Sequence, residues 1–287
     1  MRCRALRATL AAALFLAAPA CAPAPPAEAG VDAEDKPPLL DGTPGSLLVI
    51  GYSTSFAWPT MLQEMLDEHT GGERVYTVLN AVVGGSPVGR WIADPSSEDY
   101  QDTYGAMLRD FLGPDPRLLG EAPAPTIALL QQSLQRTPTR ETRLGPVTSA
   151  DDHEGIRIGA DALERLAGQL RADGIERSVI AMHIYKEGFE PEVGNERLAL
   201  DALLRRGHAW VDAGPDVWSP TIRAYPEAFA EDGLHPNELG SKIMAEGWYR
   251  VLAGASARDD IVERMRERSY DVDALTRAYL DWRAGDG

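Results

Sequence analysis

Apolar residues along the chain fall into short continuous runs that alternate with amphipathic stretches. The first run, Leu47-Leu48-Val49-Ile50, ends at Gly51, as expected for a strand that is buried on both faces of a parallel sheet. Four later runs of similar character predict further strands at residues 75–83, 126–130, 178–183 and 209–213. The pattern therefore predicts five buried strands.

Between these runs, apolar residues recur at helical spacing. From Phe56 to Leu66 they lie three and four positions apart, and Gly71-Gly72 follows as a stop signal. Helices are also predicted at residues 160–172, 195–206 and 238–253, with one or two amphipathic helices at 257–282 that the sheet does not require. The repeated strand–helix–strand order predicts an α/β protein with a doubly wound, five-stranded parallel sheet.

The N-terminus has the organisation of an export signal. Three arginines at positions 2, 4 and 7 precede an apolar run, residues 8–18, that is too short to span a bilayer. The run leads to Ala18-Pro19-Ala20-Cys21, which resembles a bacterial lipobox whose cysteine is lipidated after cleavage. We therefore expect an exported lipoprotein, in the periplasm or on the cell surface, that is anchored at Cys21. The alternative is a signal-peptidase site and a freely secreted protein.

Changes in composition along the sequence predict how the chain is divided into segments. After the signal peptide at 1–20, residues 21–45 are rich in Pro, Ala and acidic side chains and are predicted to form a disordered tether. Residues 46–255 carry the strand and helix pattern of one domain, and residues 256–287 are predicted to be a helical extension. The sequence contains no internal repeat.

The charge balance excludes some classes of partner. The 287 residues include 28 Lys+Arg and 44 Asp+Glu, which gives a formal net charge of −16. An excess of acid argues against binding to nucleic acid and against electrostatic attachment to anionic lipid, so the membrane is expected as a partner only through the lipid anchor. Only two cysteines are present, one of them in the signal, so a disulfide framework is not expected. The sequence leaves the oligomeric state open.

Two short segments have the residue types that nucleophilic catalysis needs. Ser53 directly follows the first predicted strand, where ligands bind in such sheets, although serine is also a common helix cap. The surrounding residues do not fit G-x-S-x-G. Near the other end, Asp232 precedes His235 by three residues with Gly233 between them, a spacing that lets the acid orient the histidine.

Together, LLVIGYSTS and DGLHPNELG resemble the first and last sequence blocks of the SGNH (GDSL-type) hydrolases. The resemblance covers roughly residues 46–253. It implies a three-layer α/β/α flavodoxin-like fold and an esterase, lipase or carbohydrate deacetylase activity. By position in these blocks, the resemblance implies that Ser53 is the nucleophile, His235 the base and Asp232 the acid that orients it.

The same resemblance suggests an oxyanion hole. Asn80 and, five residues later, Gly85 fit a family block in which the glycine N–H stabilises the oxyanion. The asparagine that the family has after the third strand is missing here, and Gln132 or Ser133 is the predicted substitute donor. A second departure is Tyr52, which stands where the family has an aspartate beside the nucleophile.

These observations predict an exported serine esterase that hydrolyses a short-chain, acetyl-type ester of a small molecule or a glycan. The alternatives are an O-acetyltransferase that uses the same residues, or a non-catalytic surface lipoprotein that binds glycan or a partner. No cofactor is expected, and no histidine has metal-ligand spacing. Residues 86–122 and 136–158 are expected to form loops. Trp91 is a candidate for the substrate groove. Trp58 is expected to be a core residue, and His183 a core or rim residue.

Overall fold

A computed structural model describes residues 36–92, 96, 102–131, 147, 149–187 and 192–285 of the chain. Five parallel strands form one sheet in the order β2-β1-β3-β4-β5, which is the order of flavodoxin-like folds. The strands are β1 (Gly45–Gly51), β2 (Tyr76–Asn80), β3 (Ile127–Gln131), β4 (Arg177–Ile180) and β5 (Val211–Ala213). The predicted fold class is therefore confirmed.

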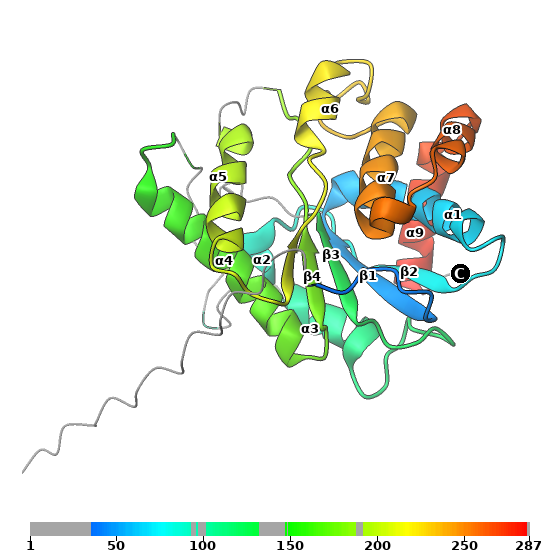
Figure 1. Ribbon diagram of the computed structural model, residues 1–287, viewed down its shortest axis with the longest axis horizontal. Helices are drawn as coiled ribbons and strands as arrows, with labels where there is room; N and C mark the ends of the chain where they lie inside the picture. The colour runs from blue at the N-terminus through cyan, green and yellow to red at the C-terminus, as the bar shows by residue number, and fades with distance from the viewer. Residues whose placement is uncertain are drawn as a thin grey trace, which may run out of the picture.

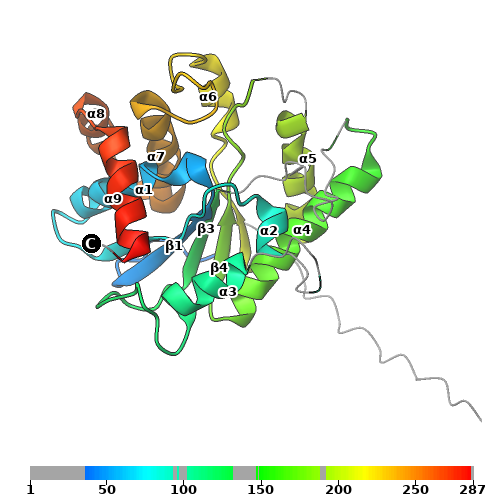
Figure 2. The same ribbon diagram turned by 180° about the vertical axis from the view of Figure 1, so that it is seen from behind.

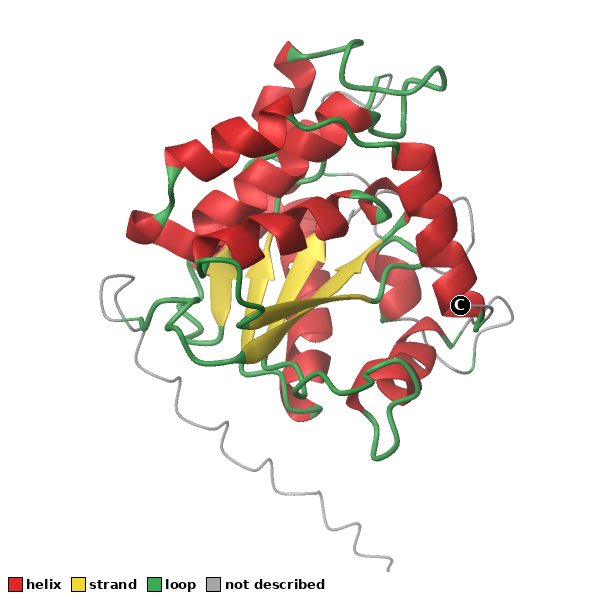
Figure 3. Cartoon of the chain, turned by 90° about the vertical axis from the view of Figure 1, so that its right-hand side faces the viewer, coloured by secondary structure: helices red, strands yellow, loops and turns green. Residues whose placement is uncertain are grey.

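Helices cover both faces of the sheet, which makes three layers (Figures 1 and 3). One face packs against α1 (Trp58–His69), α7 (Glu238–Ala253) and α8 (Asp259–Glu267). The other packs against α2 (Val88–Trp91), α3 (Thr103–Met107), the π-helical turn η3 (Leu108–Leu112), α4 (His153–Ala172) and α5 (Glu192–Leu204). The remaining elements are α6 (Trp218–Arg223), α9 (Val272–Ala284) and the 3₁₀ turns η2 (Ser53–Ser55) and η4 (Gly254–Ser256).

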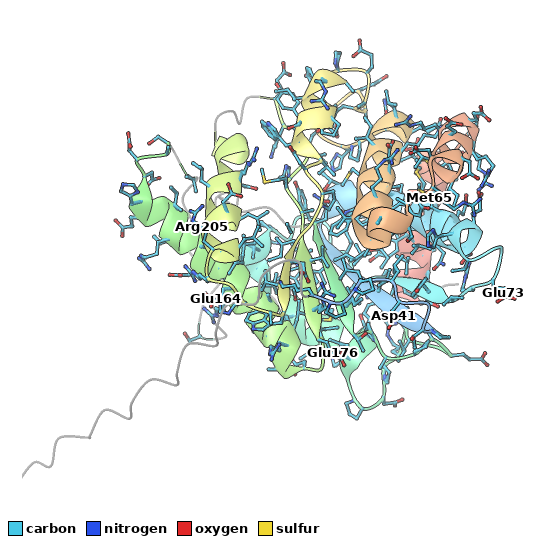
Figure 4. The ribbon with its side chains drawn as sticks, in the orientation of Figure 1. Asp41, Met65, Glu73, Glu164, Glu176 and Arg205 are labelled. Atoms are coloured by element: carbon cyan, nitrogen blue, oxygen red, sulfur yellow. The ribbon has the colours of Figure 1, made fainter. Side chains whose placement is uncertain are left out.

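Alternation along β1 explains why both faces are covered. Leu47 and Val49 point into the core beneath α1 and α7, whereas Leu48 and Ile50 point into the core beneath α4. All four side chains are buried. Figure 4 shows Met65, another buried residue, on α1 near α7, whereas Glu73 lies on the outer surface.

Some predicted boundaries differ from the observed ones. Helix α4 begins at His153, earlier than the predicted residue 160, because the Asp152 side chain accepts a 3.0 Å hydrogen bond from the Gly155 N–H and caps the helix. The expectation of loops at 86–122 is wrong in part, because α2, α3 and η3 lie there.

Trp91 is buried and is not a groove residue: its Nε1 donates to the Ser86 carbonyl at 3.0 Å. Trp58 is a core residue, as predicted.

The C-terminal extension packs against the body of the domain. Helix α8 buries Ile261, Val262 and Met265 in the same core as α1 and α7. Helix α9 lies beside the β2 edge of the sheet, as seen from both sides (Figures 1 and 2). Its buried Tyr279 packs against Phe56, with ring centroids 5.5 Å apart. The extension therefore contacts the segment that carries Ser53.

Several predictions fall on residues outside the described ranges: the signal peptide at 1–20, Cys21 and most of the tether at 21–45. In the part of the chain that is described, no helix has the length and hydropathy that crossing a membrane requires. The same residues contain no cluster of His, Cys, Asp or Glu side chains that could hold a metal ion.

Candidate active site

Ser53 lies at the carboxyl edge of the sheet, in the tight turn between β1 and α1. The turn is closed by a 2.8 Å hydrogen bond from the Ser55 N–H to the Tyr52 carbonyl. Asn80, the last residue of β2, donates from its side chain to the carbonyls of Ser55 and Phe56 at 3.3 and 3.4 Å. The end of β2 therefore holds the backbone that carries the candidate nucleophile.

Asp232 and His235 share a tight turn before α7. One oxygen of Asp232 accepts 2.9 Å hydrogen bonds from the backbone N–H groups of Leu234 and His235. Gly233 has φ +64, a left-handed conformation that glycine adopts without strain. The His235 carbonyl accepts a 2.8 Å hydrogen bond from Ala230. The local sequence thus places the carboxylate directly beside the imidazole.

Three side chains form a hydrogen-bonded relay across the two segments. His235 Nε2 lies 2.8 Å from Ser53 Oγ, and His235 Nδ1 lies 2.6 Å from Asp232 Oδ2. The hydrogen bond to His235, together with those from the backbone, lowers the pKa of Asp232 to about 2. Because an ionised carboxylate only accepts, the proton of a neutral imidazole is on Nδ1, and Nε2 is free to accept from the serine hydroxyl.

Gly85 follows β2 in a loop that is tied to the end of β1. The Ser86 hydroxyl donates to the carbonyls of Val83 and Gly51, and Trp91 Nε1 donates to Ser86. Gly85 itself has φ +66, and no atom of a described residue lies within 4 Å of the position that a Cβ would take. Backbone conformation, rather than crowding, is therefore what favours glycine at this position. The Ser53 N–H is the first of the η2 turn, where an N–H has no partner within the turn.

The two predicted side-chain donors of the oxyanion hole, Gln132 and Ser133, lie outside the described residues. The preceding residue, Gln131, is buried, and both ends of its amide are engaged. Its Nε2 donates to the Met182 carbonyl at 2.7 Å, and its Oε1 accepts from Trp248 Nε1 at 3.0 Å. Gln131 therefore joins the end of β3 to the β4 side of the sheet and to α7.

Tyr52, which replaces the acid expected beside the nucleophile, packs on His183. The two rings are stacked, with centroids 5.3 Å apart and planes 20° apart, and both side chains are buried. Burial lowers the pKa of His183 to about 4, so this histidine is neutral near pH 7. His183 is a core residue, in line with the prediction, and does not take part in the relay.

A cleft of about 710 Å³ opens beside Ser53 and His235. The turn that contains Asp232 lines one part of it, and residues 270–273 and Thr276, at the start of α9, line another. Sequence reasoning missed this second part. The available signal was the amphipathic pattern of the C-terminal tail, which requires a packing partner but does not identify it.

Several solved structures resemble this chain. They include the psychrotrophic esterase EstA from Pseudoalteromonas sp. (13% identity, 72% of this chain and 96% of that chain, TM-score 0.47). An acetyl esterase with bound acetate shows 10% identity over 78% of this chain and 100% of that chain, with a TM-score of 0.48. A lipolytic protein of the G-D-S-L family from Desulfitobacterium hafniense shows 15% identity over 72% of this chain and 99% of that chain, with a TM-score of 0.44.

No family model matches the sequence, and no curated protein matches it. The chemical interpretation of the site therefore rests on the residues of this chain.

Proposed function

We propose that this chain is a serine esterase that hydrolyses an acyl ester through Ser53, His235 and Asp232. The observation that carries the proposal is the relay itself: Asp232 to His235 Nδ1 at 2.6 Å and His235 Nε2 to Ser53 Oγ at 2.8 Å. A serine hydroxyl is a weak nucleophile until a base accepts its proton, and this arrangement supplies an oriented base. An open cleft adjoins the hydroxyl.

In the first half of the proposed reaction, Ser53 Oγ attacks the ester carbonyl carbon while His235 Nε2 takes the hydroxyl proton. The backbone N–H groups of Ser53 and Gly85 are the proposed donors to the developing oxyanion. Asp232 remains ionised and stabilises the imidazolium. Collapse of the tetrahedral intermediate breaks the bond to the alcohol oxygen, which leaves with the proton from His235.

In the second half, water replaces the alcohol. His235 Nε2 accepts a proton from water, the resulting hydroxide adds to the acyl carbon, and Ser53 Oγ leaves with the proton from the imidazolium. The products are a carboxylic acid and the regenerated serine. A sugar hydroxyl that took the place of water would give the transferase reaction instead, with the same residues.

A comparison of two serines in one turn tests the proposal. The wild-type protein should hydrolyse p-nitrophenyl acetate and be labelled by a fluorophosphonate probe, and Ser53→Ala should lower kcat by on the order of 10⁴-fold or more and abolish labelling. Ser55→Ala is the matched control, because Ser55 is buried and its hydroxyl is not part of the relay. Equal rates for wild type and Ser53→Ala, or labelling of Ser53→Ala, would refute the assignment.

We further propose that the protein is exported and anchored through a lipid on Cys21. The described chain starts at the amino-terminal edge of the sheet: Lys36 donates to the carbonyl of Val211, the first residue of β5, at 2.6 Å and pairs with Asp212 at 3.1 Å. Ser53 lies at the opposite edge. Incorporation of labelled fatty acid by wild type but not by Cys21→Ser tests the anchor.

A further inference from the structure

The cleft beside Ser53 has an acidic lining. Five carboxylate side chains line it, and no lysine or arginine does so among the residues that are described: Glu231, Asp232, Glu238, Asp271 and Asp273. A cleft lined by charge of one sign favours ligands of the opposite sign and repels ligands of the same sign. The lining therefore bears on which esters can reach the nucleophile.

Three of these carboxylates already have partners within the protein. Asp232 is bonded to His235, and Glu238 forms a 2.7 Å ion pair with Lys242. Asp271 caps α9 by accepting a 2.9 Å hydrogen bond from the Ala274 N–H. Lys242 also donates to the carbonyl of Arg266, so its ammonium group is committed to the protein and does not offset the remaining acids.

Glu231 and Asp273 both line the cleft and belong to different elements. Glu231 belongs to the loop that carries Asp232, and Asp273 lies in the first turn of α9. Both are exposed, and neither forms an ion pair with another described residue. These two side chains therefore add negative charge to the open cleft with no cationic partner among the described residues.

Ser241 provides an independent indication that a polar ligand group enters this cleft. Its side chain lines the cleft from α7 and is only 1% exposed, and its hydroxyl has no hydrogen-bond partner in the part of the chain that the structure describes. A buried hydroxyl without a partner costs stability, a cost that a ligand able to form hydrogen bonds would remove. Near carboxylates, a positively charged N–H donor fits best, because the serine oxygen can accept from it.

We propose that the cleft selects esters that carry a cationic amine, with Glu231 and Asp273 attracting the charge and Ser241 Oγ accepting a hydrogen bond from the ammonium group. This inference rests on the proposed esterase function and names its substrate class: amine-bearing esters are preferred over neutral esters, and anionic esters are excluded. Glu231, Asp273 and Ser241 are thus specificity-determining residues, separate from the relay.

Three acetate esters of matched size test the preference: piperidin-4-ylmethyl acetate (cationic), cyclohexylmethyl acetate (neutral) and the acetate ester of 4-(hydroxymethyl)cyclohexanecarboxylate (anionic). Each is assayed as a competitor of p-nitrophenyl acetate hydrolysis by the wild-type protein, so that affinity is measured whether or not the competitor is turned over. At low ionic strength, the cationic ester should compete about tenfold more strongly than the anionic one, which corresponds to about 1.4 kcal/mol. In about 1 M salt, where the Debye length is about 3 Å, the difference should largely disappear.

Substitutions test which residues cause the preference for the cationic over the anionic ester. Glu231→Gln combined with Asp273→Asn should reduce the cation-to-anion ratio by about fivefold, because each substitution removes a negative charge that attracts the cationic ester and repels the anionic one. Glu263→Gln is the matched control: Glu263 is an exposed acid on α8 that does not line the cleft, and its removal should leave the ratio unchanged. Ser241→Ala should weaken competition by the cationic ester more than by the cyclohexyl ester, without lowering Tm.

The possible outcomes distinguish a failure of the charge selection from a failure of the esterase assignment. Hydrolysis of p-nitrophenyl acetate with equal competition by all three esters would overturn the charge selection and leave the esterase assignment intact. The same holds if the Glu263→Gln control changes the ratio as much as the double variant does. Absence of any Ser53-dependent hydrolysis would overturn both.

Discussion

The Tyr279 hydroxyl donates a 2.6 Å hydrogen bond to the carbonyl of Val82, a residue 197 positions earlier in the chain. Both ends of the bond are buried. Val82 lies between Asn80, which holds the Ser53 turn, and the loop that carries Gly85. Through this bond, the C-terminal helix that walls the cleft is fixed to the backbone that leads to the candidate oxyanion hole.

Tyr279→Phe should therefore destabilise the protein. The substitution leaves the ring in place but removes the donor, so that the buried Val82 carbonyl loses this partner, at an expected cost of about 1–3 kcal/mol in the free energy of unfolding. Urea denaturation followed by circular dichroism measures the change. An unchanged midpoint would show that water or another donor replaces the phenol without cost.

Tyr52→Phe, in contrast, should not lower the free energy of unfolding. The Tyr52 hydroxyl is also buried, but it has no hydrogen-bond partner among the described residues, so its removal should leave stability unchanged or raise it by up to about 1–2 kcal/mol. The stacking of the ring on His183 is kept. The same denaturation assay should be applied to both variants. It then compares the loss of a hydroxyl that donates a hydrogen bond, in Tyr279→Phe, with the loss of a hydroxyl that does not, in Tyr52→Phe. A loss of stability for Tyr52→Phe would show that its hydroxyl has a polar partner in solution.

The two halves of the candidate site were predictable to different degrees. The turn with Asp232 and His235 is local: three residues with a glycine between them bring acid and imidazole together whatever the rest of the chain does. Ser53 and His235 are 182 residues apart, and their proximity follows from the sheet topology. The apolar runs predicted a doubly wound parallel sheet, and the family resemblance implied its flavodoxin-like form. The family resemblance added the chemical roles to that placement.

Other features could not be predicted because they depend on long-range packing. The amphipathic pattern of α9 indicates that one face is buried, but the partner of that face, around Val82, is set by tertiary structure alone. From its place near the ends of the first two strands, Trp91 is predicted to be a candidate for the substrate groove. It is buried because the Ser86 carbonyl provides a partner for its indole N–H.

His183 should make stability depend on pH between about 6.5 and about 4. Burial lowers its pKa in the folded protein to about 4, whereas an unfolded chain has the ordinary value of 6.5. As pH falls through this window, the unfolded state binds a proton that the folded state does not, so the free energy of unfolding decreases, by about 3 kcal/mol in total. The contribution is fully present above about pH 6.5.

Denaturation curves measured across this window, with His183→Gln as the comparison, isolate the effect. Burial also lowers the pKa of His69, so some pH dependence of the same sign should remain in the variant. The difference between wild type and variant is the contribution of His183. Identical slopes for both proteins would mean that His183 takes up its proton as readily when folded as when unfolded.

Asp232 should add no step to the pH profile of kcat/KM until the pH approaches about 2, because its hydrogen bonds to His235 and to backbone N–H groups lower its pKa to about that value. Above that pH the carboxylate is ionised, so it only accepts and holds the imidazole proton on Nδ1.

Asp232→Asn should lower kcat by on the order of 10³–10⁴-fold, because the amide donates to Nδ1 and places the imidazole proton on Nε2, facing the serine. Stopped-time assays of p-nitrophenyl acetate hydrolysis measure both effects, with Tm as the control for folding. A tenfold or smaller loss in a folded Asp232→Asn protein would mean that the half-exposed carboxylate does not set the tautomer of His235.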